Sequence, residues 1–252
     1  MPRAARKISS TGIYHIMIRG IDRTDIFRDE DDKDKFIEIL EKVKKEMDFE
    51  LYGYCLMDNH AHFIIKENEV SISLIMKKIC GTYGGWHNYR HHRVGHLFQD
   101  RFKSECIESN AYFIAVLKYI LTNPLKVRMV DNLKEYKWSS YQEYIKKENI
   151  TDTEYFLGML NENKKKAQKY FVEELNKDEV TVVNLTVDNI RRSDKEAEKI
   201  IAVELNELGT DNVGDLSVEK RIAFIKVLLS KGISKRQIIG ITGISKSKVS
   251  GV

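Results

Sequence analysis

The sequence predicts an α+β domain followed by an all-α C-terminal region. The expected elements of residues 14–122 run strand, helix, strand, strand, helix, strand, helix, an order typical of an antiparallel sheet with helices packed on it. From residue 151 onward the periodicity is helical, apart from a short β-branched run at 180–185 that fits no element.

Four segments predict the strands of the sheet. Residues 14–19, 49–57 and 60–66 are rich in aromatic and β-branched side chains, as strands are. The dipeptide Asp58-Asn59 is typical of a turn, so the second and third strands are expected to form an antiparallel hairpin. A fourth strand is expected at residues 97–107.

Three helices are expected to pack on this sheet. The first covers residues 29–48 and is amphipathic. Its apolar positions are Phe36, Ile39, Leu40 and Val43. The second covers residues 71–89, although glycines loosen its later half. Residues 109–110 can cap the third, and Pro124 is expected to end it, because proline cannot continue a helical backbone.

The C-terminal region predicts helices at 151–176, 194–208 and 218–230. Residues 232–249 then predict a short helix, a turn at Gly243 and the start of a second helix. This arrangement is the signature of a helix-turn-helix.

Charge is distributed unevenly along the 252 residues, although the net charge is only +4. Residues 217–252 carry eight basic and one acidic residue, whereas residues 147–216 carry ten basic and sixteen acidic ones. A basic block after an acidic one favours a separate module that meets a polyanion, although a solvated helical surface gives the same pattern. We therefore predict a folded domain at 1–146, an acidic helical linker at 147–193 and a helical DNA-binding module at 194–252.

Other sequence features disfavour whole classes of protein. No apolar run is long enough to span a bilayer, and the basic N-terminus lacks the apolar stretch of a secretory signal. We expect no membrane partner. The three cysteines, Cys55, Cys80 and Cys106, lie far apart, which favours small core residues in a reducing cytoplasm over a disulfide framework.

His60 and His62 are the most informative pair of residues. Side chains of a strand alternate between its faces, so both imidazoles are expected on the same face. Two imidazoles side by side are arranged to hold a metal ion, although so short a pattern also occurs without one.

Tyr119 and Asn123 are four residues apart on the third predicted helix, so they face the same way. If that helix packs on the face with both histidines, one site contains two imidazoles, an amide oxygen and a phenol. A divalent ion there would polarise a phosphodiester, and the phenolate would attack phosphorus to form a tyrosine–phosphate ester. A helix residue packed on the sheet is the alternative for Tyr119, one of 12 tyrosines.

Five short motifs follow one another over the first 145 residues. They are Tyr14-His15 with Arg19-Gly20, His60-Ala61-His62, Gly95-His96-Leu97-Phe98-Gln99 with Arg101-Phe102-Lys103, Tyr119-Ile120-Leu121-Thr122-Asn123-Pro124, and Trp138-Ser139-Ser140-Tyr141. In order and spacing they resemble the HUH single-strand DNA transposases with one catalytic tyrosine. The resemblance is greatest to the REP-associated tyrosine transposases.

The resemblance implies a ferredoxin-like α+β core, the HUH fold, in a catalytic domain at 1–146. It also implies that His60, His62 and Asn123 bind Mg²⁺ or Mn²⁺. Tyr119 would then attack hairpin-bearing single-stranded DNA, leaving a 5′-phosphotyrosine and a free 3′-hydroxyl. Better-known insertion-sequence members carry glutamine at the position of Asn123, which offers the same ligand oxygen on a shorter side chain. Two imidazoles and an amide favour Mn²⁺ over Mg²⁺ on chemical grounds.

Basic and aromatic side chains around these motifs are candidates for DNA contacts. The basic candidates are Arg19, Arg90, Arg93, Arg101 and Lys103. Tyr83, Trp86 and Phe98 are available for base stacking, with core packing as the alternative, most of all for Phe98. The histidines nearby suggest a second metal site only weakly, because adjacent residues such as His91 and His92 rarely point at one ion.

In the helix-turn-helix, Ser245 would begin the recognition helix. Lys246 and Lys248 would then reach phosphates or base edges of duplex DNA. Eight residues from Ser245 onward are few for a recognition helix, and a plain helical interaction tail is the alternative.

The sequence therefore predicts a metal-dependent transposase or endonuclease acting on hairpin single-stranded DNA as a monomer or homodimer. Two other classes stay open. One is a catalytically idle, domesticated relative that binds DNA and regulates, and the other is a phosphodiesterase that activates water and does not need Tyr119.

Overall fold

The computed structural model describes residues 6–146, 149–175, 194–230, 233, 235–245 and 249. The chain splits into two compact units, one of residues 1–123 and 132–183 and the other of residues 124–131 and 184–252. The unassigned run at 180–185 lies outside the described residues. Among the described residues, no helix combines the length and the apolar character needed to cross a membrane.

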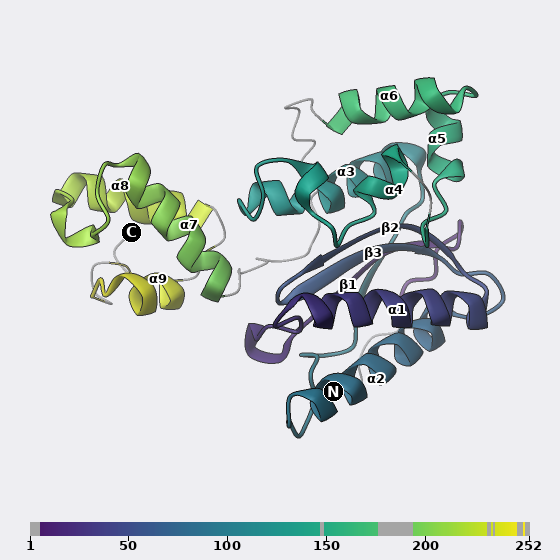
Figure 1. Ribbon diagram of the computed structural model, residues 1–252, viewed down its shortest axis with the longest axis horizontal. Helices are drawn as coiled ribbons and strands as arrows, with labels where there is room; N and C mark the ends of the chain where they lie inside the picture. The colour runs from purple at the N-terminus through teal and green to yellow at the C-terminus, as the bar shows by residue number, and fades with distance from the viewer. Residues whose placement is uncertain are drawn as a thin grey trace. The chain divides into compact units, whose positions relative to one another are not determined.

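A four-stranded antiparallel sheet in the order β2-β3-β1-β4 forms the centre of the first unit (Figure 1). The strands are β1 (Ile13–Arg19), β2 (Glu50–Met57), β3 (His60–Lys66) and β4 (Lys103–Cys106). The helices among and after them are α1 (Glu30–Met47), α2 (Ile72–Arg90) and α3 (Asn110–Lys126). This connectivity and strand order make the ferredoxin-like α+β core that the sequence predicts.

Helices α1 and α2 cover one face of the sheet, and α3 covers the other (Figure 1). Phe36 of α1 stacks on Phe63 of β3 with ring centroids 5.7 Å apart. On the opposite face, the Tyr119 ring of α3 lies 5.5 Å from the His62 ring. Because neighbouring side chains of β3 point to opposite faces, Phe63 enters the core under α1 while His60 and His62 face α3.

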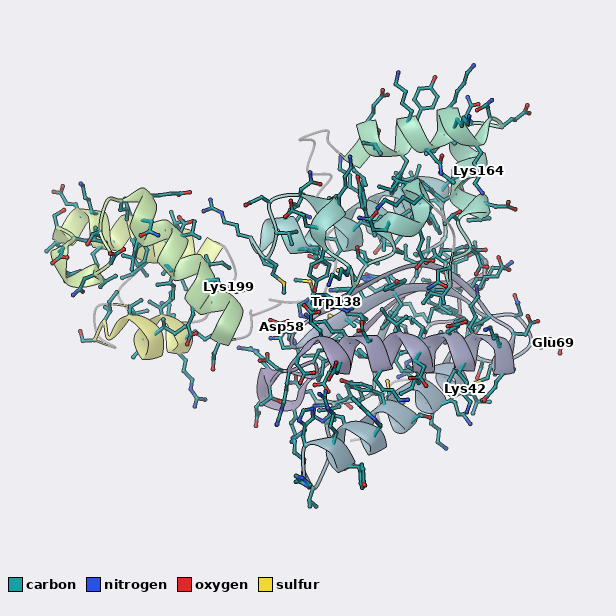
Figure 2. All side chains as sticks on the ribbon, viewed as in Figure 1. Lys42, Asp58, Glu69, Trp138, Lys164 and Lys199 are labelled. Carbon is teal, nitrogen blue, oxygen red and sulfur yellow. The ribbon has the colours of Figure 1, made fainter. Side chains whose placement is uncertain are left out.

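Helix α1 is amphipathic and capped at its start, as its sequence predicts. The Asp29 side chain accepts a hydrogen bond from the Asp32 backbone amide at 3.0 Å, which satisfies one amide of the first turn. All four predicted apolar positions, Phe36, Ile39, Leu40 and Val43, are buried. The polar side, including Lys42, projects into solvent (Figure 2).

The predicted end of the third helix is wrong. Helix α3 continues through Pro124 to Lys126. The fixed φ of proline is compatible with a helix, so the cost is the hydrogen bond that the Ile120 carbonyl would otherwise accept, together with local bending.

The predicted length of the fourth strand is also wrong, because only Lys103–Cys106 pairs with β1. Phe98 forms an isolated bridge with Gly20 beyond the end of β1. Between them, the Asp100 carboxylate accepts a hydrogen bond from the Arg101 backbone amide at 2.7 Å. Such local bonds compete with ladder pairing.

Three short helices complete the first unit: α4 (Tyr141–Ile145), α5 (Glu154–Leu160) and α6 (Lys164–Leu175). They share an aromatic core, in which the Tyr144 and Phe171 rings are 4.7 Å apart and the Phe156 and Phe171 rings 5.8 Å apart. The functional boundaries after residues 146 and 193 stay a prediction.

Within its described residues the second unit is all-α, in agreement with the predicted C-terminal region. It contains α7 (Asp194–Glu207), α8 (Val218–Ser230) and α9 (Lys235–Thr242). Gly243 follows α9 with a φ of 71°, the left-handed conformation that suits a helix-ending glycine. Lys246 and Lys248 lie outside the described residues, so the helix-turn-helix stays a prediction.

Candidate active site

The register between β1 and β3 brings three histidines together. Met17 lies opposite His62 and Arg19 opposite His60, and His15 shares the face of Met17 because strand side chains alternate. The Nε2 atom of His15 is 3.0 Å from Nδ1 of His62, and the two rings stack with centroids 5.2 Å apart. All three histidines are at most 2% exposed.

The hydrogen bonds of His60 and His62 orient both rings. Nδ1 of His60 is 2.6 Å from the side-chain oxygen of Asn59. A carbonyl oxygen only accepts, so the His60 proton belongs on Nδ1 and Nε2 carries the lone pair. Nδ1 of His62 contacts His15, while its Nε2 is buried without a hydrogen-bond partner among the described residues.

His62 is held in its neutral form. Burial lowers the pKa of His62 well below its ordinary value, and the nearby His60, His15 and Arg19 lower it further. Neutral imidazole is the form that binds metal ions. At neutral pH, His62 therefore does not need to lose a proton before it binds one.

Tyr119 lies beside this cluster. Its ring is nearly perpendicular to that of His62, at 88° and 5.5 Å, and its centroid is 6.4 Å from that of His15. Tyr119 is partly exposed. Part of the Tyr119 side chain is therefore accessible to solvent while its ring lies beside the histidines.

Asn123 follows one turn later on the same face of α3 and is 6% exposed. Its amide nitrogen is buried without a hydrogen-bond partner within the described part of the chain. A half-turn of the amide exchanges nitrogen and oxygen, which would present the oxygen instead. The unpartnered atoms of His62 and Asn123 and the donor set of two imidazoles and an amide fit a divalent ion, with Mn²⁺ suited better than Mg²⁺.

The turn before His60 is fixed by a buried ion pair. The Lys33 ammonium lies 2.9 Å from the Asp58 carboxylate, and both side chains are at most 10% exposed. Lys33 also lies 4.6 Å from the centre of the Trp138 ring, so Asp58 and Trp138 lie close together at this end of the hairpin (Figure 2). The start of β3 is therefore anchored to α1.

Two of the predicted DNA-binding residues share the face of the histidines. Arg19 is paired with His60, and Lys103 of β4 is paired with Met17. Lys103 is exposed, so its charge is available beside the site.

The structure does not bring the other basic residues to this cluster. The Arg90 guanidinium forms ion pairs with Asp29, Asp31 and Asp32 at the start of α1. Arg101 lines a groove of 620 Å³ beside α2. Arg93 follows the end of α2, where its backbone amide donates to the Asn88 carbonyl.

The aromatic candidates for base stacking differ in their exposure to solvent. Tyr83 is completely buried, and its hydroxyl donates to the Ile26 carbonyl at 2.6 Å. The expectation that Tyr83 stacks on bases is therefore wrong. Trp86 and Phe98 are partly exposed.

The sequence did not predict that His15 belongs to the candidate site. The sequence places it in a motif with Tyr14, but no local pattern shows that it contacts His62. Strand register alone reveals that contact, because the two residues are 47 positions apart.

A comparison with protein families gives a match within the first unit. Residues 9–123 match the family of IS200-like transposases, and this stretch includes His60, His62, Tyr119 and Asn123. No curated protein matches the chain.

Two solved structures are also similar to this chain. A REP-associated tyrosine transposase bound to a REP hairpin is 18% identical, with a TM-score of 0.49 over 57% of this chain and 86% of the other. A protein of Deinococcus radiodurans R1 classed among transposases is 17% identical, with a TM-score of 0.35 over 47% and 95% of the two chains.

Proposed function

We propose that residues 9–123 form a transposase domain that cuts and rejoins hairpin-bearing single-stranded DNA through a covalent 5′-phosphotyrosine on Tyr119. The observation that carries the proposal is the position of the Tyr119 ring, 5.5 Å from the ring of His62. The family match to residues 9–123 supports an enzyme that acts on DNA. The proposed substrate class, hairpin-bearing single-stranded DNA, is taken from the resemblance of the sequence motifs to the REP-associated tyrosine transposases.

His60, His62 and Asn123 would hold Mg²⁺ or Mn²⁺. When bound, the ion would polarise the phosphodiester and stabilise the charge that develops on its oxygens. Asn59 orients the His60 ring and His15 orients the His62 ring. Such outer partners fix the tautomer that leaves a ring nitrogen for the metal.

Tyr119 supplies the nucleophile. Its phenolic oxygen forms a bond to phosphorus and loses its proton, while the bond between phosphorus and the 3′ oxygen breaks and that oxygen gains a proton. The products are a 5′-phosphotyrosine and a free 3′-hydroxyl. Because the ester conserves the energy of the broken bond, a second 3′-hydroxyl can attack it and rejoin the strand.

Contacts away from the reacting phosphate remain part of the proposal. Arg19 and Lys103 lie on the face of the histidines, where their charges would position the DNA backbone. Duplex binding through Lys246 and Lys248 and the choice between monomer and homodimer stay predictions.

A covalent trapping assay tests the proposed function. Labelled single-stranded hairpin DNA is incubated with the full chain and Mn²⁺, and the protein is separated under denaturing conditions. Wild type should give a labelled adduct, and Tyr119→Phe should give none. Tyr170→Phe is a matched control, because Tyr170 is an exposed tyrosine of α6, and it should behave as wild type.

Each other outcome identifies another function. Cleavage that persists in Tyr119→Phe without an adduct means a phosphodiesterase that activates water. Tight binding without cleavage by wild type, with either Mg²⁺ or Mn²⁺, means a domesticated DNA-binding regulator.

A further inference from the structure

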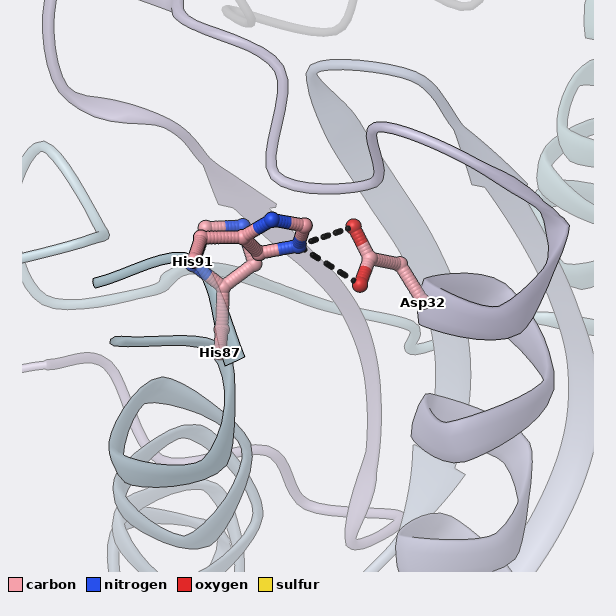
Figure 3. Close-up of side chains that lie close together, drawn as sticks. All are labelled: Asp32, His87 and His91. Atoms are coloured by element: carbon pink, nitrogen blue, oxygen red, sulfur yellow. Dashed lines mark hydrogen bonds and ion pairs between the residues drawn. The ribbon is translucent and has the colours of Figure 1, made fainter. Parts of the chain in front are cut away.

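A second cluster of metal-binding side chains joins α1 to the end of α2. His87 lies in the last turn of α2, and His91 is the residue that ends the helix. Asp32 reaches them from the first turn of α1 (Figure 3). One ligand atom from each of the three residues lies within 4.8 Å of the others.

His87 is the residue that points to a ligand. It is completely buried, and neither of its ring nitrogens has a hydrogen-bond partner from any described residue. A neutral imidazole offers one donor and one acceptor, and leaving both unmatched in a buried site is unfavourable. Its ring lies 4.4 Å from that of His91, so a single ion could bind one lone-pair nitrogen from each ring.

The Asp32 carboxylate lies where it could share a metal ion with the two histidines. It is completely buried, and His91 Nε2 lies 2.9 Å from one of its oxygens and 3.0 Å from the other. The Arg28 backbone amide donates to one oxygen, and Arg90 pairs with the other. Arg90 would thus act as the outer-shell partner that holds a ligating carboxylate in place.

Acidic side chains gather on one side of the cluster. Three carboxylates, those of Asp29, Asp31 and Asp32, surround the single guanidinium of Arg90. Arg28 and Arg93 also act electrostatically on His87, so the surroundings of the cluster carry charges of both signs.

We infer that Asp32, His87 and His91 bind a zinc-type divalent ion that fastens α1 to the end of α2. Two imidazoles four residues apart at the end of a helix and one carboxylate form a donor set that suits Zn²⁺. The site is distinct from that of His60 and His62, because α1 and α2 cover the opposite face of the sheet (Figure 1). Adjacent histidines such as His91 and His92 rarely point at the same ion. In this cluster the partner of His91 is His87, one helical turn earlier, so that difficulty does not arise.

This site would also steady the connection that follows α2. The Arg93 amide donates to the Asn88 carbonyl, and the Asn88 side chain donates to the Gly95 carbonyl. Asn88 and Gly95 line the groove beside α2. An ion at the end of the helix would fix one wall of that groove.

Zinc titration of the full chain tests the inference. The starting protein is stripped with a chelator and carries His60→Ala and His62→Ala, so that the first site does not contribute. It should bind one Zn²⁺ per chain, and its melting temperature should rise with Zn²⁺. Adding His87→Phe or His91→Gln should weaken Zn²⁺ binding by more than about 100-fold, beyond the usual loss for an outer-shell partner.

Controls separate loss of ligands from loss of the fold. His96→Gln changes an exposed histidine of the same connection and should keep full Zn²⁺ binding. His91 is largely but not fully buried, so His91→Gln serves if His87→Phe does not fold. No Zn²⁺ binding by the starting protein, or Zn²⁺ binding that survives both substitutions, would overturn the inference. Either result leaves the Tyr119 adduct assay untouched.

Discussion

The Nε2 atom of His15 lies 3.0 Å from Nδ1 of His62, and Nδ1 of His15 lies 4.0 Å from the Glu105 carboxylate. If Nε2 of His62 binds a metal ion, Nδ1 of His62 must carry the proton and donate it to His15. The His15 proton then sits on Nδ1 and faces Glu105. Residues from three neighbouring strands thus determine which nitrogen of His62 is available.

This relationship predicts that His15 controls metal affinity. His15→Ala should weaken Mn²⁺ binding by about 10- to 100-fold, as the loss of an outer-shell partner usually does. His15→Gln should lose less, because its amide oxygen can accept the His62 proton. Adduct yield measured against Mn²⁺ concentration checks this, and a curve for His15→Ala that overlies wild type contradicts it.

The buried pair of Lys33 and Asp58 should dominate the stability of the hairpin that carries His60. Lys33→Ala leaves the Asp58 carboxylate buried without its cation, and such losses cost about 3–5 kcal/mol. Lys33→Met combined with Asp58→Asn should cost much less, since no charge is then left uncompensated. Urea unfolding of the three proteins measures the difference, and equal losses in both variants would show that the charges do not interact.

Two glycines should respond oppositely to alanine. A Cβ at Gly20 would lie 2.1 Å from the Thr24 carbonyl oxygen, so Gly20→Ala should destabilise by about 1–3 kcal/mol or more. Gly85, in α2, has nothing within 4 Å of its Cβ position, so Gly85→Ala should stabilise by up to about 1 kcal/mol. Urea unfolding midpoints test both, and a neutral Gly20→Ala would contradict the tight turn after β1.

Lowering the pH should destabilise the metal-free protein, in part because the folded chain holds His87 in its neutral form. Burial lowers its pKa from the ordinary 6.5 to about 4, so between these values the unfolded chain binds a proton that the folded chain does not. Stability is therefore lost as pH falls, by about 1.4 kcal/mol per pH unit and about 3 kcal/mol in total. His87→Phe lacks this loss, and its unfolding free energy measured against pH in a chelator should diverge from wild type below about pH 6.5. Parallel curves would contradict the buried neutral imidazole.

Local periodicity was enough to predict half of the candidate site. The alternation of a strand places His60 and His62 on one face, and the helical repeat aligns Tyr119 with Asn123. Neither pattern reveals which face of the sheet α3 covers. The contact of Tyr119 with His62 and the place of His15 depend on tertiary packing and strand register.

Arg90 and Tyr83 show why composition misleads. Both lie in a basic, aromatic segment that suggests DNA binding, yet their partners come from elsewhere in the chain. Arg90 pairs with three carboxylates of α1 and its cap, and Tyr83 donates to the Ile26 carbonyl. A segment's own sequence does not report such distant partners.

The most direct test of the central claim is to locate the DNA-bearing residue. Wild-type adduct formed with Mn²⁺ is digested with nuclease and protease, and the nucleotide-bearing peptide is sequenced by mass spectrometry. We predict that the nucleotide is attached through its 5′ phosphate to Tyr119. Attachment to any other residue, or cleaved DNA with no modified peptide, would contradict the account.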